Sequence, residues 1–111
     1  MKIEARQRLL DVLEACRAVE RFTKGKDFAA YQHDEMLRAA VERKLEVIGE
    51  AFTKLEHVEP DLAEKFPELR KIVGLRNRII HGYDSVDDEI LWDVVHNKVP
   101  GLRRQVEQSL K

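Results

Sequence analysis

One short segment gathers side chains that could act on a phosphate group: Arg76, Asn77, Arg78, His81 and Tyr83. Histidine titrates near neutral pH, so it can accept or donate a proton under working conditions. Arginine stays cationic, and its planar guanidinium matches the geometry of a phosphate. Together they suit metal-free cleavage of an RNA phosphodiester, because one group moves a proton while the other neutralises charge on phosphorus. The tyrosine could stack on a base or donate a hydrogen bond.

Helical spacing relates these side chains but does not identify the arginine that would serve the histidine. Asn77 and His81 are i, i+4 neighbours, and Arg78 and His81 are i, i+3 neighbours. Arg76 lies about 140° around an ideal helix from His81 and could reach it only through its long side chain or if Gly82 unwinds the last turn. Residue types and spacing alone favour a simpler alternative, an ordinary basic helix end stabilised by the helix dipole.

The apolar residues recur at helical spacing, and no segment shows the alternation of a β-strand. We expect helices over about residues 2–23, 28–57, 60–66 and 68–81, and from residue 87 to the C-terminus. Gly25 and Gly82 are the signals that end helices. The signals that begin helices are Pro60, Asp87, and either Asp27 or Asp34, which compete as N-caps. Pro100 should kink or split the last helix and stand first in its second piece. The predicted fold is all-α, an antiparallel bundle of four to five helices forming one domain over residues 1–111.

Composition narrows the classes of function. Charged residues make up 37% of the 111 residues, with only 5 Gly and 3 Pro, which is typical of long solvated helices. Lys and Arg number 20 against 21 Asp and Glu, so we do not expect binding of nucleic acid through bulk charge, while a local basic patch stays open as an alternative. Cys16 is the only cysteine, which excludes an internal disulfide and a cysteine-based zinc site. No apolar run or leader suggests a membrane or secretion, so we expect a cytoplasmic protein.

Two clusters contain residue types that bind metal ions, but their spacing does not suit a metal site. His33, Asp34 and Glu35 are adjacent and therefore point in different directions, and Asp93 with His96 lacks further ligands. We therefore predict no metal site and no cofactor.

Three other features have ordinary explanations. Trp92 is better explained as a core or interface anchor than as a base-stacking platform, and Cys16 as a small buried hydrophobe. Glu46 and Glu50 form an i, i+4 pair that could either hold an arginine of the motif or be solvated; spacing does not decide between these alternatives.

Arg76, His81 and Tyr83 follow the spacing Arg-x4-His-x-Tyr, with Asn77 directly after the arginine. This pattern resembles the signature of HEPN ribonucleases and, more narrowly, the HepT toxins (DUF86). Flanking patterns in the same order strengthen the resemblance, which covers about residues 38–102. Residues 40–51 resemble the second-helix pattern of that family, and residues 74–78 with 81–83 resemble its active-site helix. Residues 86–87 and 90–95 resemble the segment that follows this helix.

The resemblance implies a HEPN-like helical bundle that dimerises, with two motifs facing one another across a cleft. It implies a metal-independent endoribonuclease in which Arg76 and His81 are catalytic, supported by Asn77 and Arg78. It also implies an antitoxin of the minimal nucleotidyltransferase class (MntA), which silences the toxin by attaching AMP to the motif tyrosine, here Tyr83.

Two other functions remain open at this point. Some small helical proteins of the superfamily resemble non-catalytic substrate-binding subunits of a two-component minimal nucleotidyltransferase. The intact Arg76, Asn77 and His81 favour the enzyme, since a degenerate motif would favour the binding subunit. A plain helical interaction module is the third alternative.

Overall fold

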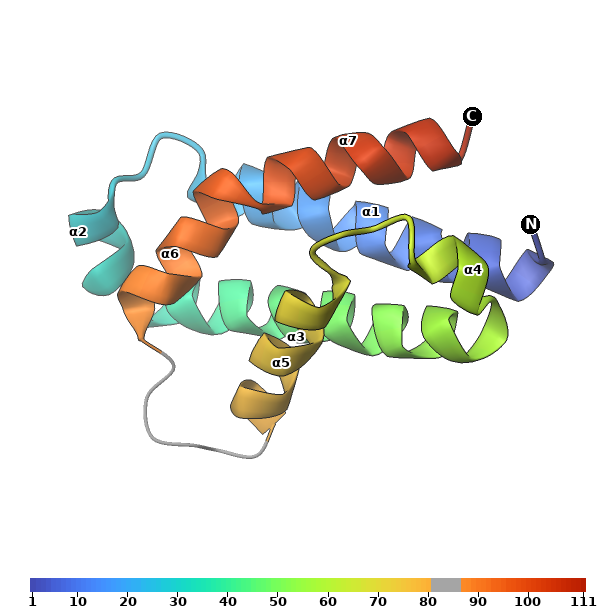
Figure 1. Ribbon diagram of the computed structural model, residues 1–111. Coiled ribbons are helices and arrows are strands. Elements are labelled where there is room, and N and C mark those ends of the chain that lie inside the picture. The colour runs from blue at the N-terminus through green and yellow to red at the C-terminus, as the bar shows by residue number, and fades with distance from the viewer. Residues whose placement is uncertain (81–86) are drawn as a thin grey trace.

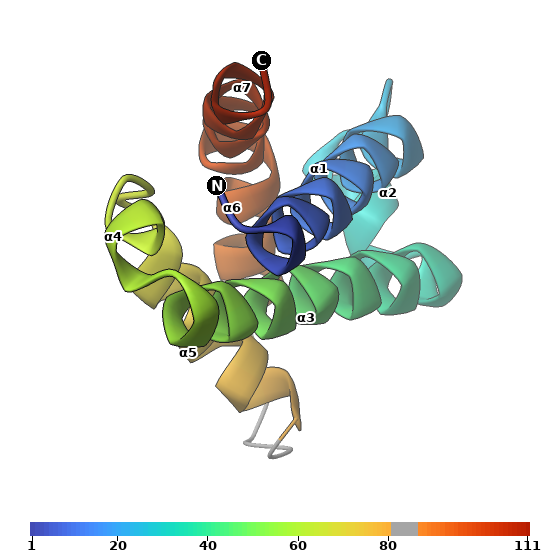
Figure 2. The same ribbon diagram turned by 90° about the vertical axis from the view of Figure 1, so that its right-hand side faces the viewer.

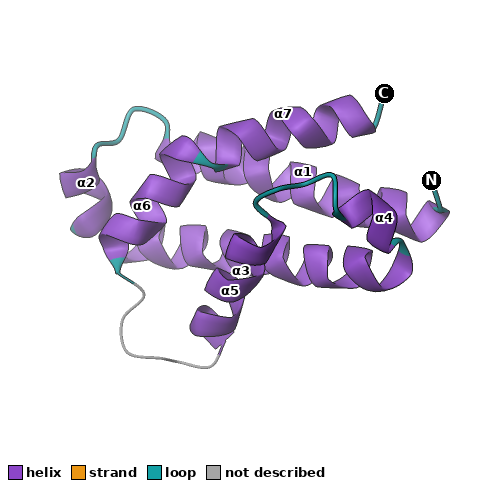
Figure 3. Cartoon of the chain, viewed as in Figure 1, coloured by secondary structure: helices purple, strands orange, loops and turns teal. Residues whose placement is uncertain are grey.

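The computed structural model describes residues 1–80 and 87–111, and for residues 69, 70, 76, 79 and 80 it describes the backbone alone. In this part of the chain all regular structure is helical, as predicted (Figures 1 and 3). The helices are α1 (Ile3–Thr23), α2 (Phe28–Gln32), α3 (Glu35–Val58), α4 (Pro60–Ala63), α5 (Leu69–Ile80), α6 (Asp88–Asn97) and α7 (Val99–Ser109).

The two longest helices, α1 and α3, form the body of the bundle together with α7. α1 packs on both α3 and α7, and it runs antiparallel to each of them (Figure 1). α5 packs on α3 but is steeply inclined to it, so its end projects to one side of the bundle (Figure 2). Within residues 1–80 and 87–111, none of the helices combines the length and apolar character needed to cross a lipid bilayer.

One cluster of buried apolar side chains connects all seven described helices. Phe52 and Phe66 lie within it with ring centroids 5.6 Å apart, and Tyr31 is fully buried beside Trp92, with centroids 5.0 Å apart. Trp92 is half-buried and packs against this cluster, as an anchor would. Cys16 is fully buried, as predicted, and burial raises the pKa of its thiol to about 12.

The chain breaks where a single helix over residues 28–57 was predicted, and that prediction is wrong. Asp27 and Asp34, predicted as competing N-caps, are both N-caps. The Asp27 carboxylate accepts a hydrogen bond from the Ala30 amide at 2.8 Å, and the Asp34 carboxylate accepts one from the Leu37 amide at 3.0 Å. Because Asp34 has extended backbone angles, α2 ends before it and α3 begins after it.

Other helix ends agree closely with the sequence signals. Gly25 has a left-handed φ of 74°, which allows the chain to leave α1, and Asp87 caps α6 through the Glu89 amide at 2.8 Å. α7 begins at Val99, so Pro100 is its second residue instead of the first. The breaks after Gln32 and Asn97 are why the described chain has seven helices where four to five were predicted.

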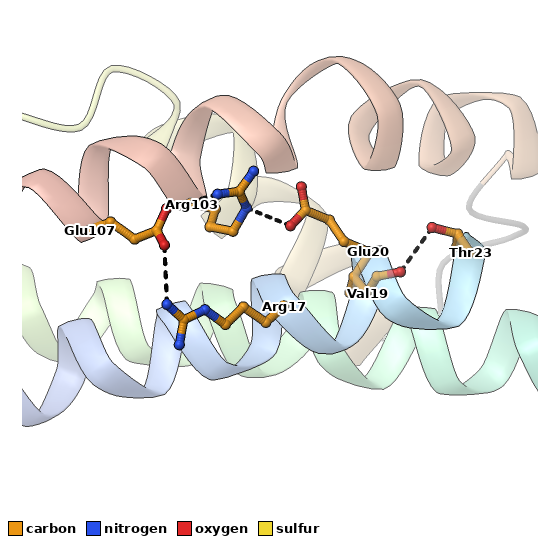
Figure 4. Close-up of polar contacts among 6 residues, drawn as sticks. All are labelled: Arg17, Val19, Glu20, Thr23, Arg103 and Glu107. Atoms are coloured by element: carbon orange, nitrogen blue, oxygen red, sulfur yellow. Dashed lines mark hydrogen bonds and ion pairs between the residues drawn. The ribbon is translucent and has the colours of Figure 1, made fainter. Parts of the chain in front are cut away.

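A network of ion pairs joins α1 to α7 (Figure 4). The Arg103 guanidinium donates to Glu20 at 2.6 Å and to Glu107 at 2.8 Å, and Arg17 donates to Glu107 at 3.1 Å. The hydrogen bond from Arg17 is the main cause of the lowered pKa of the Glu107 carboxyl. These side chains are partly exposed, so the network adds only a little to the stability of the fold.

Candidate functional site

α5 is the element that carries the arginine part of the sequence motif. It follows Pro67, and its first turn closes when the Ile72 amide donates to the Glu68 carbonyl at 3.1 Å. Ile72 and Leu75 are buried against the core, which fixes the rotation of the helix about its axis. The last two turns then hold residues 76–78, as the sequence predicts.

The structure describes the predicted site residues unequally. For Arg76 it describes only the backbone, which lies in α5. Asn77 is half-buried and Arg78 is exposed, which places both at the surface of the same helix end. His81 and Tyr83, the predicted catalytic histidine and modified tyrosine, lie outside the described residues. The predicted grouping of arginine and histidine therefore stays a prediction.

A hollow of about 340 Å³ opens beside this helix end, where α5 and α6 face one another. We call it the α5–α6 hollow. Its lining residues are Lys71, Gly74, Leu75 and Arg78 from α5, and Ile90 and Val94 from α6. Of these, only Arg78 was predicted from the sequence to be functional. The available signal was the i, i+3, i+4, i+7 spacing of the four α5 residues, which places them on one face.

Among the described lining residues of the hollow, the charged ones are cations and the others are apolar or glycine. Lys71 and Arg78 are exposed cations, and neither forms an ion pair with any residue that the structure describes. The nearby Glu68 pairs with Lys98 at 3.5 Å. Leu75 and Val94, by contrast, are buried. Such a surface attracts an anion that also carries an apolar group.

Two partly buried carboxylates influence one another between α3 and α6: Glu42 in α3 and Asp88, the first residue of α6. Burial, and then the negative charge of Asp88, raise the pKa of the Glu42 carboxyl. Burial likewise raises the pKa of the Tyr31 hydroxyl, which contacts no hydrogen-bond partner in the described part of the chain.

The metal-like clusters have other partners. His33 Nδ1 lies 2.8 Å from the Ala29 carbonyl oxygen, and Asp34 caps α3. His96 Nδ1 lies 3.2 Å from the Trp92 carbonyl oxygen. Over the residues that the structure describes, no three His, Cys, Asp or Glu side chains are placed to hold a metal ion. Glu46 accepts a hydrogen bond from Arg43 at 2.9 Å, which gives that carboxylate a partner within its own helix.

The fold defines a class of protein, an all-α helical bundle of the HEPN type with a basic, surface-exposed helix end. Comparison with known proteins then identifies the family: residues 12–109 match the family described as Ribonuclease HepT-like. The match covers most of the chain, so this protein belongs to the HepT-like ribonuclease family.

Several relatives align over nearly their whole length. "Putative RNase MJ1380" from Methanocaldococcus jannaschii is 41% identical over 101 residues, which cover 89% of this chain and 90% of the relative. "Putative RNase MJ0127" from the same organism is 36% identical and covers 99% of this chain and 90% of the relative. "Probable ribonuclease HepT" from Thermococcus cleftensis is 33% identical and covers 100% of both chains. No solved structure gives a significant match.

Proposed function

We propose that this protein is the toxin of a HepT/MntA-type toxin–antitoxin pair, a metal-independent endoribonuclease that acts in the cytoplasm. The observation that carries the proposal is the family match over residues 12–109, which includes the whole Arg-x4-His-x-Tyr segment. The ribonuclease names of the relatives support RNA as the substrate. The exposed basic end of α5 supports a site for an anionic polymer.

Each motif residue has a role that follows from its chemistry. His81 transfers the proton of the attacking or leaving hydroxyl, and Arg76 neutralises charge that develops on the phosphate. Asn77 and Arg78 support them from α5. α5 is held by the buried Ile72 and Leu75, so a site on it has a rigid base. Dimerisation would bring a second set of these cations to the same cleft.

The test is RNA cleavage by purified protein in the presence of EDTA. His81→Ala should lower the rate by about 10²–10⁴-fold, because the proton-transfer group is removed. Arg76→Lys should also lower it, since lysine lacks the planar fork, whereas Arg78→Ala should have a smaller effect. Activity that disappears with EDTA and returns with magnesium would contradict the mechanism. A native protein that binds nucleotides but cleaves no RNA would instead support the substrate-binding subunit.

Control by a partner is the second part of the proposal. An MntA-like nucleotidyltransferase would attach AMP to Tyr83, adding a bulky group with about one negative charge that can pair with Arg76 and block RNA entry. The chain has one other tyrosine, Tyr31, which is fully buried and so cannot present its hydroxyl to an enzyme.

Intact mass after incubation with the cognate transferase and ATP measures this modification. The tyrosine oxygen would displace pyrophosphate from ATP, so the native chain should gain one adenylyl group, which is AMP less one water. Tyr83→Phe should gain none while it keeps its fold and some cleavage activity. Equal modification of native and Tyr83→Phe protein would reject Tyr83 as the site.

A further inference from the structure

The α5–α6 hollow has a feature that the packing of the fold does not explain. Gly74 lies in the interior of α5, where glycine is destabilising relative to alanine. A Cβ atom built at Gly74 would meet no described atom within 4 Å beyond its chain neighbours and the backbone of its own helix, so no close neighbour among the described residues requires a glycine there. Gly74 is exposed and lines the hollow, so the absence of a side chain provides open space.

The lining selects the chemistry of an occupant. Among the residues that the structure describes, no carboxylate lines the hollow, and the two charged lining residues, Lys71 and Arg78, are both cations. They stand two helical turns apart on α5, about 10.5 Å along its axis. Leu75 lies between them on the same face of α5, and Ile90 of α6, which is 44% exposed, lines the hollow as well. An apolar wall between two cations fits a flat base flanked by phosphates.

The size of the hollow agrees with such a ligand. Its volume of about 340 Å³ falls at the lower end of the roughly 300–1,000 Å³ of small-molecule sites. It also adjoins the helix end that carries Arg76, within the same two turns of α5. A nucleotide held in the hollow would therefore belong to the same RNA strand as the phosphate that reaches Arg76.

We propose that the α5–α6 hollow is a nucleotide subsite, which holds one base of single-stranded RNA beside the cleavage position. The base packs against Leu75 and Ile90 over Gly74, and the flanking phosphates contact Lys71 and Arg78. This inference rests on the proposed ribonuclease function, since it specifies the substrate as a strand with an unpaired base at this position. Duplex RNA keeps its bases stacked and would not fill the hollow.

The experiment measures binding separately from cleavage. The probe is a fluorescent single-stranded RNA in which every 2′-hydroxyl is methylated, so it lacks the nucleophile for internal cleavage, and fluorescence anisotropy gives its Kd. Gly74→Leu should weaken binding about tenfold or more by filling the hollow, and Gly74→Ala should weaken it less. Gly101→Ala, in α7, is the matched control and should leave binding unchanged.

Stability separates a blocked subsite from a damaged fold. Ala and Leu are better helix formers than Gly, so Gly74→Ala, Gly74→Leu and Gly101→Ala should keep or raise Tm. Weaker binding by a protein with an equal or higher Tm is the expected signature. If a Gly74 variant binds the probe more weakly and its sedimentation coefficient also changes, the hollow is an interface between two copies of the chain. That result would overturn the proposal.

The cations give an independent measure through salt dependence. For single strands, removing one cation that neutralises a phosphate should make the slope of log K against log salt concentration shallower by about 0.7. Lys71→Gln and Arg78→Gln should each show this shallower slope, and Arg104→Gln in α7 should keep the native slope.

Failure of this proposal can be told apart from failure of the proposed function. Native protein that binds the probe and cleaves ordinary RNA, with Gly74→Leu equal to it in both, would overturn the subsite alone. Native protein that binds the probe but cleaves no RNA, with Gly74→Leu weakened, would overturn the ribonuclease function and keep the subsite.

Discussion

Burial determines what individual side chains of this protein can do chemically. Cys16 is fully enclosed between α1 and its neighbours, and its thiol therefore stays protonated where an exposed thiol would ionise. Tyr31 is also fully buried. Because the chain has two tyrosines, we propose Tyr83 as the modification site. Neither buried group is suited to be a nucleophile, because the reactive form of a thiol or phenol is its anion.

The buried thiol should make the protein sensitive to alkali. The unfolded thiol ionises near pH 9, whereas the native one holds its proton to about pH 12, so the native state binds more protons between these values. The free energy of unfolding should then fall as pH rises through this window, by at most about 1.4 kcal/mol per pH unit from this group. Urea unfolding between pH 8 and 11 measures the slope.

Cys16→Ala is the matched variant for this measurement. It should show a shallower decline with pH than the native chain, although its stability at pH 8 is expected to be slightly lower because the cavity is less well filled. The decline that remains would come partly from Tyr31, whose pKa is also raised by burial. Identical slopes for the two proteins would reject the role of the thiol.

At the scale of helices, three glycines should respond in opposite directions to the same substitution. Gly25→Ala should destabilise the protein by about 1 kcal/mol, because its left-handed φ of 74° is strained for alanine. Gly74→Ala and Gly101→Ala should each stabilise it by about 0.5–1 kcal/mol, since both lie within helices with room for a methyl group. Thermal or urea unfolding of the three variants measures the signs, and stabilisation by Gly25→Ala would contradict the first.

The helix ends were largely predictable because they depend on local chemistry. A carboxylate at an N-cap, or a glycine that must adopt a left-handed φ, needs only its neighbours in the chain to have its effect. The break between α2 and α3 was not predicted, because Asp27 and Asp34 were predicted as competing N-caps of one helix, whereas each caps a helix of its own. Periodicity alone cannot show that Asp34 interrupts a helix.

The candidate site was predictable only in part, for a related reason. That Arg76, Asn77 and Arg78 share a helix follows from the local sequence, and the structure confirms it. The α5–α6 hollow could not be predicted, since Ile90 and Val94 come from a helix whose direction relative to α5 is set by tertiary packing. The relation of His81 to the arginines stays a prediction.

At the scale of the whole molecule, the protein should be a dimer. Several large apolar side chains remain exposed on the described surface, among them Ile3 at 91% and Met36 at 82%. The net charge of −1 gives little repulsion between two copies, and pairing would double the cations at one cleft. Light scattering at micromolar concentration and above measures the mass, and a monomer throughout this range would reject the prediction.

The positions of the two chain ends have a consequence for the order of the helices. Residues 1 and 111 lie at the same end of the molecule, away from the tip of α5 (Figures 1 and 2). A short flexible linker could therefore join them, and the chain could be reopened at Gly25, between α1 and α2. Such a circular permutant would start at α2 and end at α1, yet it would keep the neighbours of every helix.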